Sequence, residues 1–397
     1  MKKMILLGSL VLIMLTACGK EDNVVDIKPI EPNVVYNQQA FPSIPDIEDN
    51  YIAPLNTMVS VKSTRSDIDE LMINLEPILT KGHKLFDGYH YYRDSEDNLV
   101  TNIKLINDHY NSGETLIVDE ELANFLNKVI RLSELTRGYF TPFMGNVINL
   151  YDGKFSPFPV ANTDPDANLI KEALNSVVPV DKMREVLVID GNTVKFNAYN
   201  DQESVILNVG AASKGQVAND LDAYLKSETD EYLVDIGSSN ILTNSTKGAT
   251  VGIRSPYNKV ASIYTINLTG GYGLSTSGDD NNYYLLEEDP SIIRSHILNP
   301  FTGYSENYYR SVSIISEDSM IADALTTALF NIPEIDEILD IIEAVKAEFN
   351  VNIELALLKE VDQEGQKCDL YMTTGFEELI VEDYITNHIR EVHVIGK

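Results

Sequence analysis

The apolar residues of this chain follow two periods that mix without a regular order, and this pattern limits the fold more than any other feature. Strand-like runs lie at residues 186–190, 232–236, 251–254, 263–268 and 311–315. Helix-like spacing lies at 119–137, after 210–215, at 322–329 and at 335–349. A steady β-α-β alternation would favour a doubly wound sheet. Its absence predicts an α+β fold with mixed sheets and packed helices.

The first 18 residues predict export. Lys2 and Lys3 precede an apolar run that ends in Leu-Thr-Ala-Cys, a sequence typical of a bacterial lipobox. We therefore expect a lipoprotein signal peptide at residues 1–17 and a lipid on Cys18. The anchored protein would lie at the outer face of the cytoplasmic membrane. A plain secretory signal with a chance cysteine is the alternative.

The sequence after Cys18 predicts a linker and then one folded domain. Residues 18–50 are polar, acidic and interrupted by prolines, which is typical of a flexible tether. The domain is expected at 51–397. Only Cys368 remains in it, so an internal disulfide is excluded once Cys18 carries lipid. The 44% content of apolar residues suffices for an ordinary core.

The charge of the chain excludes one class of partner. Its formal net charge is −31, and removal of residues 1–17, which contain two lysines and no acid, takes it to −33. Nucleic-acid binding needs clustered lysine and arginine, so we expect no nucleic-acid partner. The same charge opposes close contact with anionic lipid, so the lipid would act only as a tether.

Asp323 and Thr327 are candidate metal ligands. They are four residues apart in a helical run, so their side chains project from the same face. Mg²⁺ prefers oxygen ligands and often takes only one or two protein carboxylates together with substrate phosphates. The alternative is that both residues form the ordinary polar flank of a core helix, since apolar residues at 321, 324, 325, 328 and 329 form an i, i+3, i+4 stripe.

Two further segments suggest phosphate chemistry. Small residues at 210–215 lead into a helix, where backbone N–H groups and Lys214 could approach a phosphate. Tight packing of a helix on a strand uses the same residues. His296 could serve as acid or base near neutral pH, or be structural. Residues 276–279, Thr-Ser-Gly-Asp, are expected to form a turn. Neither a Rossmann nor a P-loop motif is present.

Together, in this order and spacing, these segments resemble the ApbE family of FAD:protein FMN transferases. The matching segments are Asn-Thr-Met-Val-Ser (56–60), Leu-Ile-Asn (105–107), Gly-Tyr-Phe-Thr-Pro-Phe-Met-Gly (138–145), Asn-Val-Gly-Ala-Ala-Ser-Lys-Gly (208–215), Val-Gly-Ile-Arg-Ser-Pro (251–256), Thr-Ser-Gly-Asp (276–279), His-Ile-Leu-Asn-Pro-Phe-Thr-Gly (296–303) and Ala-Asp-Ala-Leu-Thr-Thr (322–327). The resemblance covers about 51–376. It implies a single compact, T-fold-related flavin transferase domain.

The resemblance also implies an activity. A family member of this kind uses Mg²⁺ to split FAD and attaches FMN to a Thr or Ser hydroxyl of an exported acceptor flavoprotein, in a target of the type Asp-x-x-[Ser/Thr]-x-Ala-Thr, with release of AMP. In the family, the main-chain carbonyl at the position of Ala211 completes the metal site with Asp323 and Thr327. His296 would be the acid or base. The flavin contacts carry over to Met58, Thr141, Asn208, Lys214 and Ile297.

Some positions depart from the family pattern. Thr141 and Asn208 stand where the family usually has Asp, Val59 where it has Gly, and Asn299 where it has Asp. Thr and Asn keep hydrogen-bonding groups but lose the charge, so flavin binding is expected to be weaker or altered. The metal and histidine positions match.

Two other functions remain open at this point. A lipid-anchored solute-binding protein would share the signal, the linker and the acidic surface. A family member that only binds FAD, or hydrolyses it to FMN and AMP, would share every motif. The acceptor depends on how a partner docks, so the motifs do not separate transfer from hydrolysis.

Overall fold

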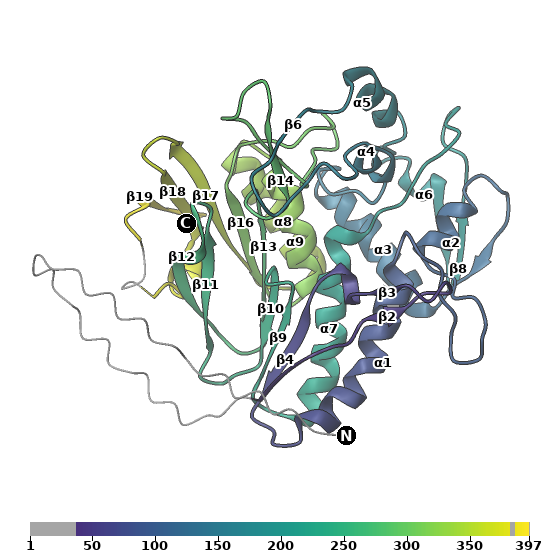
Figure 1. Ribbon diagram of the computed structural model, residues 1–397, viewed down its shortest axis with the longest axis horizontal. Coiled ribbons are helices and arrows are strands. Elements are labelled where there is room, and N and C mark those ends of the chain that lie inside the picture. Colours follow the sequence, from purple (N-terminus) through teal and green to yellow (C-terminus); the bar gives the residue numbers. More distant parts are fainter. Residues whose placement is uncertain (1–36, 382–385, 397) are drawn as a thin grey trace, which may run out of the picture. The chain divides into compact units, whose positions relative to one another are not determined.

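A nine-stranded sheet forms the centre of the protein in the computed structural model, which describes residues 37–381 and 386–396. The strands are, in spatial order, β1 (Asn37–Ala40), β4 (Val59–Ser63), β9 (Tyr232–Ile236), β10 (Asn240–Thr243), β13 (Tyr272–Gly278), β16 (Ser311–Ser316), β17 (Ile353–Asp362), β18 (Lys367–Thr373) and β19 (Ile389–Ile395). Neighbouring strands are antiparallel except β18 and β19, which are parallel. The α+β prediction is therefore confirmed (Figure 1).

Helices and small sheets surround this sheet. The helices are α1 (Ile68–Phe86), α2 (Ile103–Asp108), α3 (Glu120–Leu135), α4 (Gly145–Asn149), α5 (Ala167–Leu174), α6 (Met183–Val186), α7 (Gly210–Glu228), α8 (Ser319–Phe330), α9 (Ile335–Phe349), α10 (Thr374–Glu377) and the 3-10 turn Pro54–Asn56. The small sheets are β2 (Ile44–Pro45) with β3 (Tyr51–Ile52), β5 (Leu116–Ile117) with β8 (Thr193–Phe196) and β7 (Leu187–Asp190), β15 (Ile293–Ser295) with β14 (Tyr283–Leu286) and β6 (Ala161–Asn162), and β11 (Ala249–Ser255) with β12 (Asn258–Leu268).

Both faces of the central sheet are buried. Alternate residues of β16 and β17 point to opposite sides: Ile314 and Leu355 join the core under the helices, whereas Ile315 and Leu358 join the core under β11 and β12. Figure 1 shows α1, α7 and α8 on one side of the sheet and the β11–β12 hairpin on the other. Because both faces are covered, every residue of β16 is buried, including its three serines.

Several sequence predictions match the structure closely. The strand at 232–236 and the helix at 335–349 have the predicted bounds, and α3 begins after Asp119, whose side chain accepts a hydrogen bond from the Glu121 N–H. Such an N-cap satisfies one of the free donors of the first turn. These elements are confirmed because capping and periodicity are local signals.

Three predictions need correction. The expected linker, residues 18–50, ends too late: β1 pairs with β4 and β2 pairs with β3, so residues 37–45 already belong to the sheets of the folded part. Residues 276–278 belong to β13 and are not a turn, because they pair with β16. The segment 210–215 does not precede α7 but forms its first turns.

The signal peptide at 1–17, Cys18 and residues 18–36 of the expected linker lie outside the described residues. Within residues 37–381 and 386–396, no helix combines the length and the apolar character that a membrane span requires.

Candidate active site

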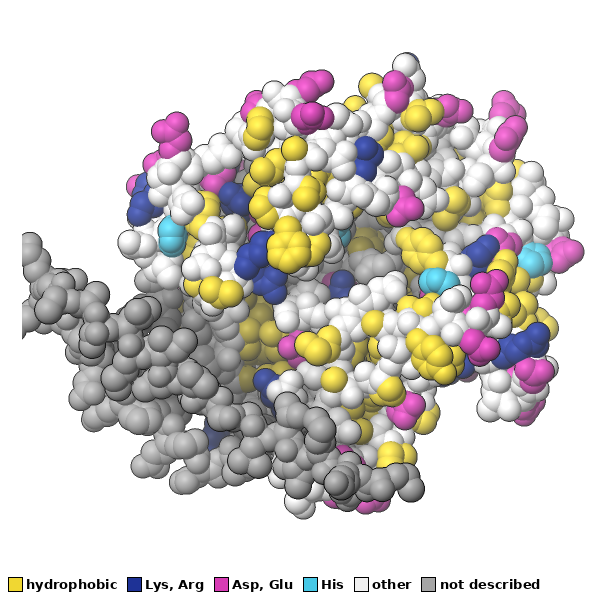
Figure 2. Space-filling view, in the orientation of Figure 1, with side chains coloured by type: hydrophobic (Ala, Val, Ile, Leu, Met, Phe, Trp, Pro, Cys, Tyr) yellow, Lys and Arg dark blue, Asp and Glu magenta, His cyan; other side chains and the backbone are white. Residues whose placement is uncertain are grey.

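A cleft of about 1520 Å³ opens where α7, α8, the end of β13 and the loop after β15 meet. Figure 2 shows a hollow near the centre of this face, with basic and apolar side chains around it. Eight of the predicted site residues line the cleft: Thr141, Asn208, Ala211, Lys214, His296, Ile297, Asp323 and Thr327. Met58 does not line it; this side chain is 68% exposed, although its neighbour Thr57 is part of the wall.

Asp323 is a buried carboxylate on α8. It is 5% exposed, and Thr327 is the single residue of α8 that is not fully buried. The Gly215 N–H donates to Oδ2 (3.1 Å) and the Asn240 amide to Oδ1 (3.1 Å). Among the described residues, no cation forms an ion pair with Asp323. The structure therefore rules out the alternative that Asp323 lies on a solvated polar flank.

The electrostatic environment of Asp323 is set by burial and by one lysine. Burial raises the pKa of Asp323, because a charged carboxylate loses its hydration. The charge of Lys214 and the hydrogen bonds from Asn240 and Gly215 act in the opposite direction on this pKa. A positive ion in the cleft would act in the same direction as Lys214.

Gly215 allows α7 and α8 to approach closely enough to form this arrangement. A Cβ at Gly215 would lie 2.2 Å from the Ser319 carbonyl oxygen and 2.7 Å from Met320 Cα, both in the first turn of α8. Such contacts are far inside van der Waals distance. Only glycine fits here, so Gly215 allows the two helices to pack closely, as the alternative hypothesis for this segment predicts. Its N–H group also donates a hydrogen bond to Asp323.

The donor set suits a hard cation. In a regular α-helix the Gly215 N–H points at the carbonyl oxygen of Ala211, four residues earlier. Because this N–H also donates to Asp323, the Ala211 carbonyl and the Asp323 carboxylate converge on one small region, and Thr327 follows one turn later on the cleft side of α8. One carboxylate, one carbonyl and one hydroxyl match what Mg²⁺ takes from proteins when phosphates supply further ligands.

His296 follows β15, and its tautomer is fixed. Its Nδ1–H donates to the main-chain carbonyl of Asn282 (3.2 Å), an acceptor only, so Nε2 carries the free lone pair. The residue is solvent-exposed and lines the cleft. Desolvation and, to a smaller extent, the charge of Lys214 lower the pKa of His296 to about 4. The imidazole is therefore neutral at pH 7.

Lys214 links the two groups. It lies in the second turn of α7, and its charge lowers the pKa of both His296 and Asp323, so the ammonium is close to each of them. Within the described part of the chain it forms no ion pair. A helix beginning and an unpaired lysine on one wall provide positive potential for phosphate oxygens.

The remaining predicted flavin contacts differ in what they offer. Asn208 donates through Nδ2 to the Tyr89 hydroxyl (3.0 Å) and accepts from the Gly210 N–H, so its amide ties Tyr89 to the start of α7. Thr141 is nearly buried and accepts from the Phe143 N–H. Ile297 is buried in the core and lines the cleft only in part.

Two residues of the site had no recognisable sequence signal. Tyr89 and Asn240 lie outside the motifs, on a loop after α1 and at the start of β10. Only the pairing of β10 with β9 and β13 places Asn240 beneath α8.

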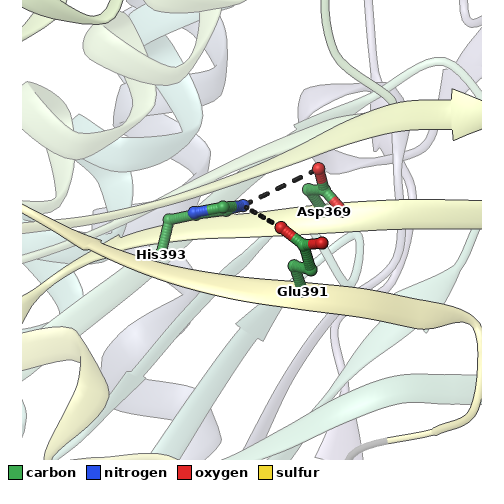
Figure 3. A group of neighbouring side chains, drawn as sticks. All are labelled: Asp369, Glu391 and His393. Carbon is green, nitrogen blue, oxygen red and sulfur yellow. Dashed lines mark ion pairs between the residues drawn. The ribbon is translucent and has the colours of Figure 1, made fainter.

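A second group of side chains with metal-binding potential lies outside the cleft. Figure 3 shows Asp369 on β18 with Glu391 and His393 on β19. His393 Nε2 lies 3.7 Å from Asp369 Oδ2 and 3.5 Å from Glu391 Oε2. Arg390 already donates to both oxygens of Asp369. The group is therefore an ion-pair network at the edge of the sheet, and we assign no metal to it.

Comparisons with known proteins agree with the geometry. A profile of the ApbE family matches residues 57–351. The FAD:protein FMN transferase of Vibrio cholerae is 27% identical over 273 residues, 68% of this chain and 73% of that protein. The FAD:protein FMN transferase of Haemophilus influenzae is 24% identical over 361 residues, 86% of this chain and 91% of that protein.

Solved structures show the same fold. The flavin transferase ApbE from Vibrio cholerae superposes with a TM-score of 0.65 at 21% identity and covers 87% of this chain and 100% of that chain. The ApbE protein of Thermotoga maritima gives a TM-score of 0.63 at 22% identity, covering 87% and 99%. The family match spans more than half of the chain and includes every predicted site residue except Cys18. The chain therefore belongs to the ApbE family.

Proposed function

We propose that this protein is a Mg²⁺-dependent FAD:protein FMN transferase. The observation that carries the proposal is the convergence of Asp323, the first turns of α7 with Lys214, and a neutral His296 in one cleft. The cleft exceeds the roughly 300–1,000 Å³ of ordinary small-molecule pockets. This size suits a dinucleotide together with a segment of an acceptor protein.

Mg²⁺ bound by Asp323, Thr327 and the Ala211 carbonyl would supply Lewis-acid neutralisation of the pyrophosphate charge. Lys214 and the N–H groups of α7 bind the same oxygens and stabilise charge that develops on them. Tyr89, Asn208 and Thr141 would contact the flavin. Asn208 and Thr141 stand where the family usually has Asp, so this part of the site carries less negative charge.

His296 provides the base. Its Nε2 takes the proton of an acceptor Thr or Ser hydroxyl while Asn282 holds Nδ1–H. The hydroxyl oxygen bonds to the phosphorus of the FMN half, the bond from this phosphorus to the bridging oxygen breaks, and AMP leaves with that oxygen. A bound pyrophosphate raises the low pKa of His296, because a nearby anion favours the protonated imidazole.

The experiment is a mass measurement. Residues 37–397 are incubated with FAD and Mg²⁺, with and without an acceptor protein carrying an Asp-x-x-[Ser/Thr]-x-Ala-Thr target, and intact masses are read. An FMN-sized gain on the acceptor that EDTA and Asp323→Asn abolish is expected. Asp340→Asn, on the exposed side of α9, is the matched control and should retain full turnover. If FMN and AMP form without an adduct on the acceptor, the protein is an FAD hydrolase and the transferase proposal is wrong. If FAD binds without any turnover, the protein is an FAD carrier.

We also propose that the protein works outside the cell on a lipid anchor at Cys18. The support is the signal and the Leu-Thr-Ala-Cys sequence. Cys18→Ser should abolish the recovery of the protein in the membrane fraction. If as much protein stays in the membrane fraction as for wild type, Cys18 is not a lipid anchor.

A further inference from the structure

Asn240 is a buried amide that no sequence motif singled out. It is the first residue of β10 and is 1% exposed. In the sheet it lies opposite Ser275 of β13 on one side and Ile236 of β9 on the other. Its side chain contacts Asp323, which is 83 residues away in the sequence.

The hydrogen bonds of Asn240 fix which end of its amide faces Asp323. The Ser275 hydroxyl donates to Asn240 Oδ1, which occupies the carbonyl end. The Nδ2 end then donates to Asp323 Oδ1 (3.1 Å) and more weakly to the Ser239 hydroxyl (3.4 Å). Rotating the amide by 180° would place two oxygens against each other at Asp323 and leave Ser275 without its acceptor.

Asp323 is therefore held at both oxygens by neutral donors. Asn240 holds Oδ1 and the Gly215 N–H holds Oδ2. Neither donor carries a formal charge, so neither forms an ion pair that a metal cation would have to displace. A lysine or arginine at position 240 would cancel that charge, and a serine would be too short to reach α8.

We infer that Asn240 is a positioning residue that turns the free lone pairs of Asp323 toward the cleft, where Thr327 and the Ala211 carbonyl complete an oxygen site for a divalent cation. This inference rests on the proposed metal dependence. Partners that orient a metal ligand typically change metal affinity about 10–100-fold when they are removed. Asn240 would then act through Asp323 without touching substrate.

The test measures metal binding directly. Mn²⁺ is titrated into wild type and Asn240→Leu without added nucleotide, which would itself bind the ion, and free Mn²⁺ is read by electron paramagnetic resonance. Leucine has the same number of non-hydrogen side-chain atoms and the same branching as asparagine, but it cannot donate a hydrogen bond. We expect Mn²⁺ affinity to fall about 10–100-fold, while FAD affinity measured without metal stays within about twofold of wild type.

Two further variants separate positioning from stability. Thr243→Val changes another fully buried polar residue of β10, which bonds to the Tyr232 carbonyl and not to Asp323, so it should lower the unfolding temperature but keep Mn²⁺ affinity. Ser275→Ala removes the hydrogen bond that holds the Asn240 amide in place, so it should also lower Mn²⁺ affinity, but less than Asn240→Leu does. It serves as the test variant if Asn240→Leu fails to fold.

The outcomes decide separate questions. If Asn240→Leu binds Mn²⁺ like wild type, the positioning role of Asn240 is overturned, but the metal assignment is not. The same holds for Ser275→Ala if only that variant folds. An equal loss of affinity in Thr243→Val also overturns the positioning role, because the effect would then be general destabilisation. A wild-type protein that binds no Mn²⁺ overturns the metal assignment together with the inference.

Discussion

Replacing Gly215 with alanine tests how the site is built. The added Cβ would lie 2.2 Å from the Ser319 carbonyl oxygen and 2.6 Å from the Ser319 carbonyl carbon. Both are backbone atoms of α8, so no side chain can move aside. Restoring a normal contact requires α7 and α8 to separate by about 1 Å. The hydrogen bond from the Gly215 N–H to Asp323, now 3.1 Å, would then be lost.

The expected cost has two parts. Overpacking of this kind destabilises by about 1–3 kcal/mol, which lowers the unfolding temperature by a few degrees, roughly 2–4 °C for each kcal/mol in a large domain. Loss of a donor to Asp323 should reduce Mg²⁺-dependent FAD turnover about 10–100-fold at temperatures where the variant is folded. Thermal unfolding and FAD turnover, measured on the same sample, check both parts.

A second glycine provides the control. Gly88 also lines the cleft, but a Cβ there would meet its nearest atom, Ile103 Cγ2, at 3.5 Å, and its φ is not positive. Gly88→Ala should therefore keep the wild-type unfolding temperature. If Gly215→Ala unfolds and turns over FAD like wild type, the close approach of α7 and α8 is not what holds Asp323 in place.

Two predictions concern pH. Lys214→Gln removes the smaller of the two causes that lower the pKa of His296, so this pKa should rise above about 4 but stay below its ordinary value, because desolvation remains. The imidazole NMR signal should show this shift, and an unchanged midpoint would refute the proximity of the two groups. His83, 2% exposed, accepts from the Leu55 N–H and is held neutral by burial, with a pKa lowered to about 4. Because the unfolded chain binds a proton below about 6.5 and the folded chain does not, the stability due to His83 is complete above about pH 6.5 and declines as pH falls toward 4. The stability difference between wild type and His83→Gln in urea unfolding should therefore shrink over this window, by at most about 3 kcal/mol, and a constant difference would contradict the assignment.

The elements that local chemistry defines were predictable. The strand at 232–236 is a short run rich in aromatic and branched apolar residues. The helix at 335–349 has a clear apolar stripe, and both elements have the predicted bounds. The strand ending at Gly278 was mistaken for a turn because Thr, Ser, Gly and Asp favour turns locally, whereas pairing with β16 decides the conformation. β1 was assigned to the linker for a similar reason: Asn-Gln-Gln-Ala has no strand-like pattern, and only β4 makes it a strand.

Four residues of the candidate site could be identified from the sequence alone. His296, Lys214, Asp323 and Thr327 stand in motifs with recognisable spacing, and all four line the cleft. Their state was decided by tertiary structure. The spacing of Asp323 and Thr327 is the same whether Asp323 lies on a solvated polar face of the helix or is buried beside the cleft, so the spacing does not distinguish the two cases. Its donors come from residues 108 and 83 positions away in the chain. Burial, strand register and the packing of α7 on α8 depend on contacts between distant segments, so no local pattern in the sequence encodes them.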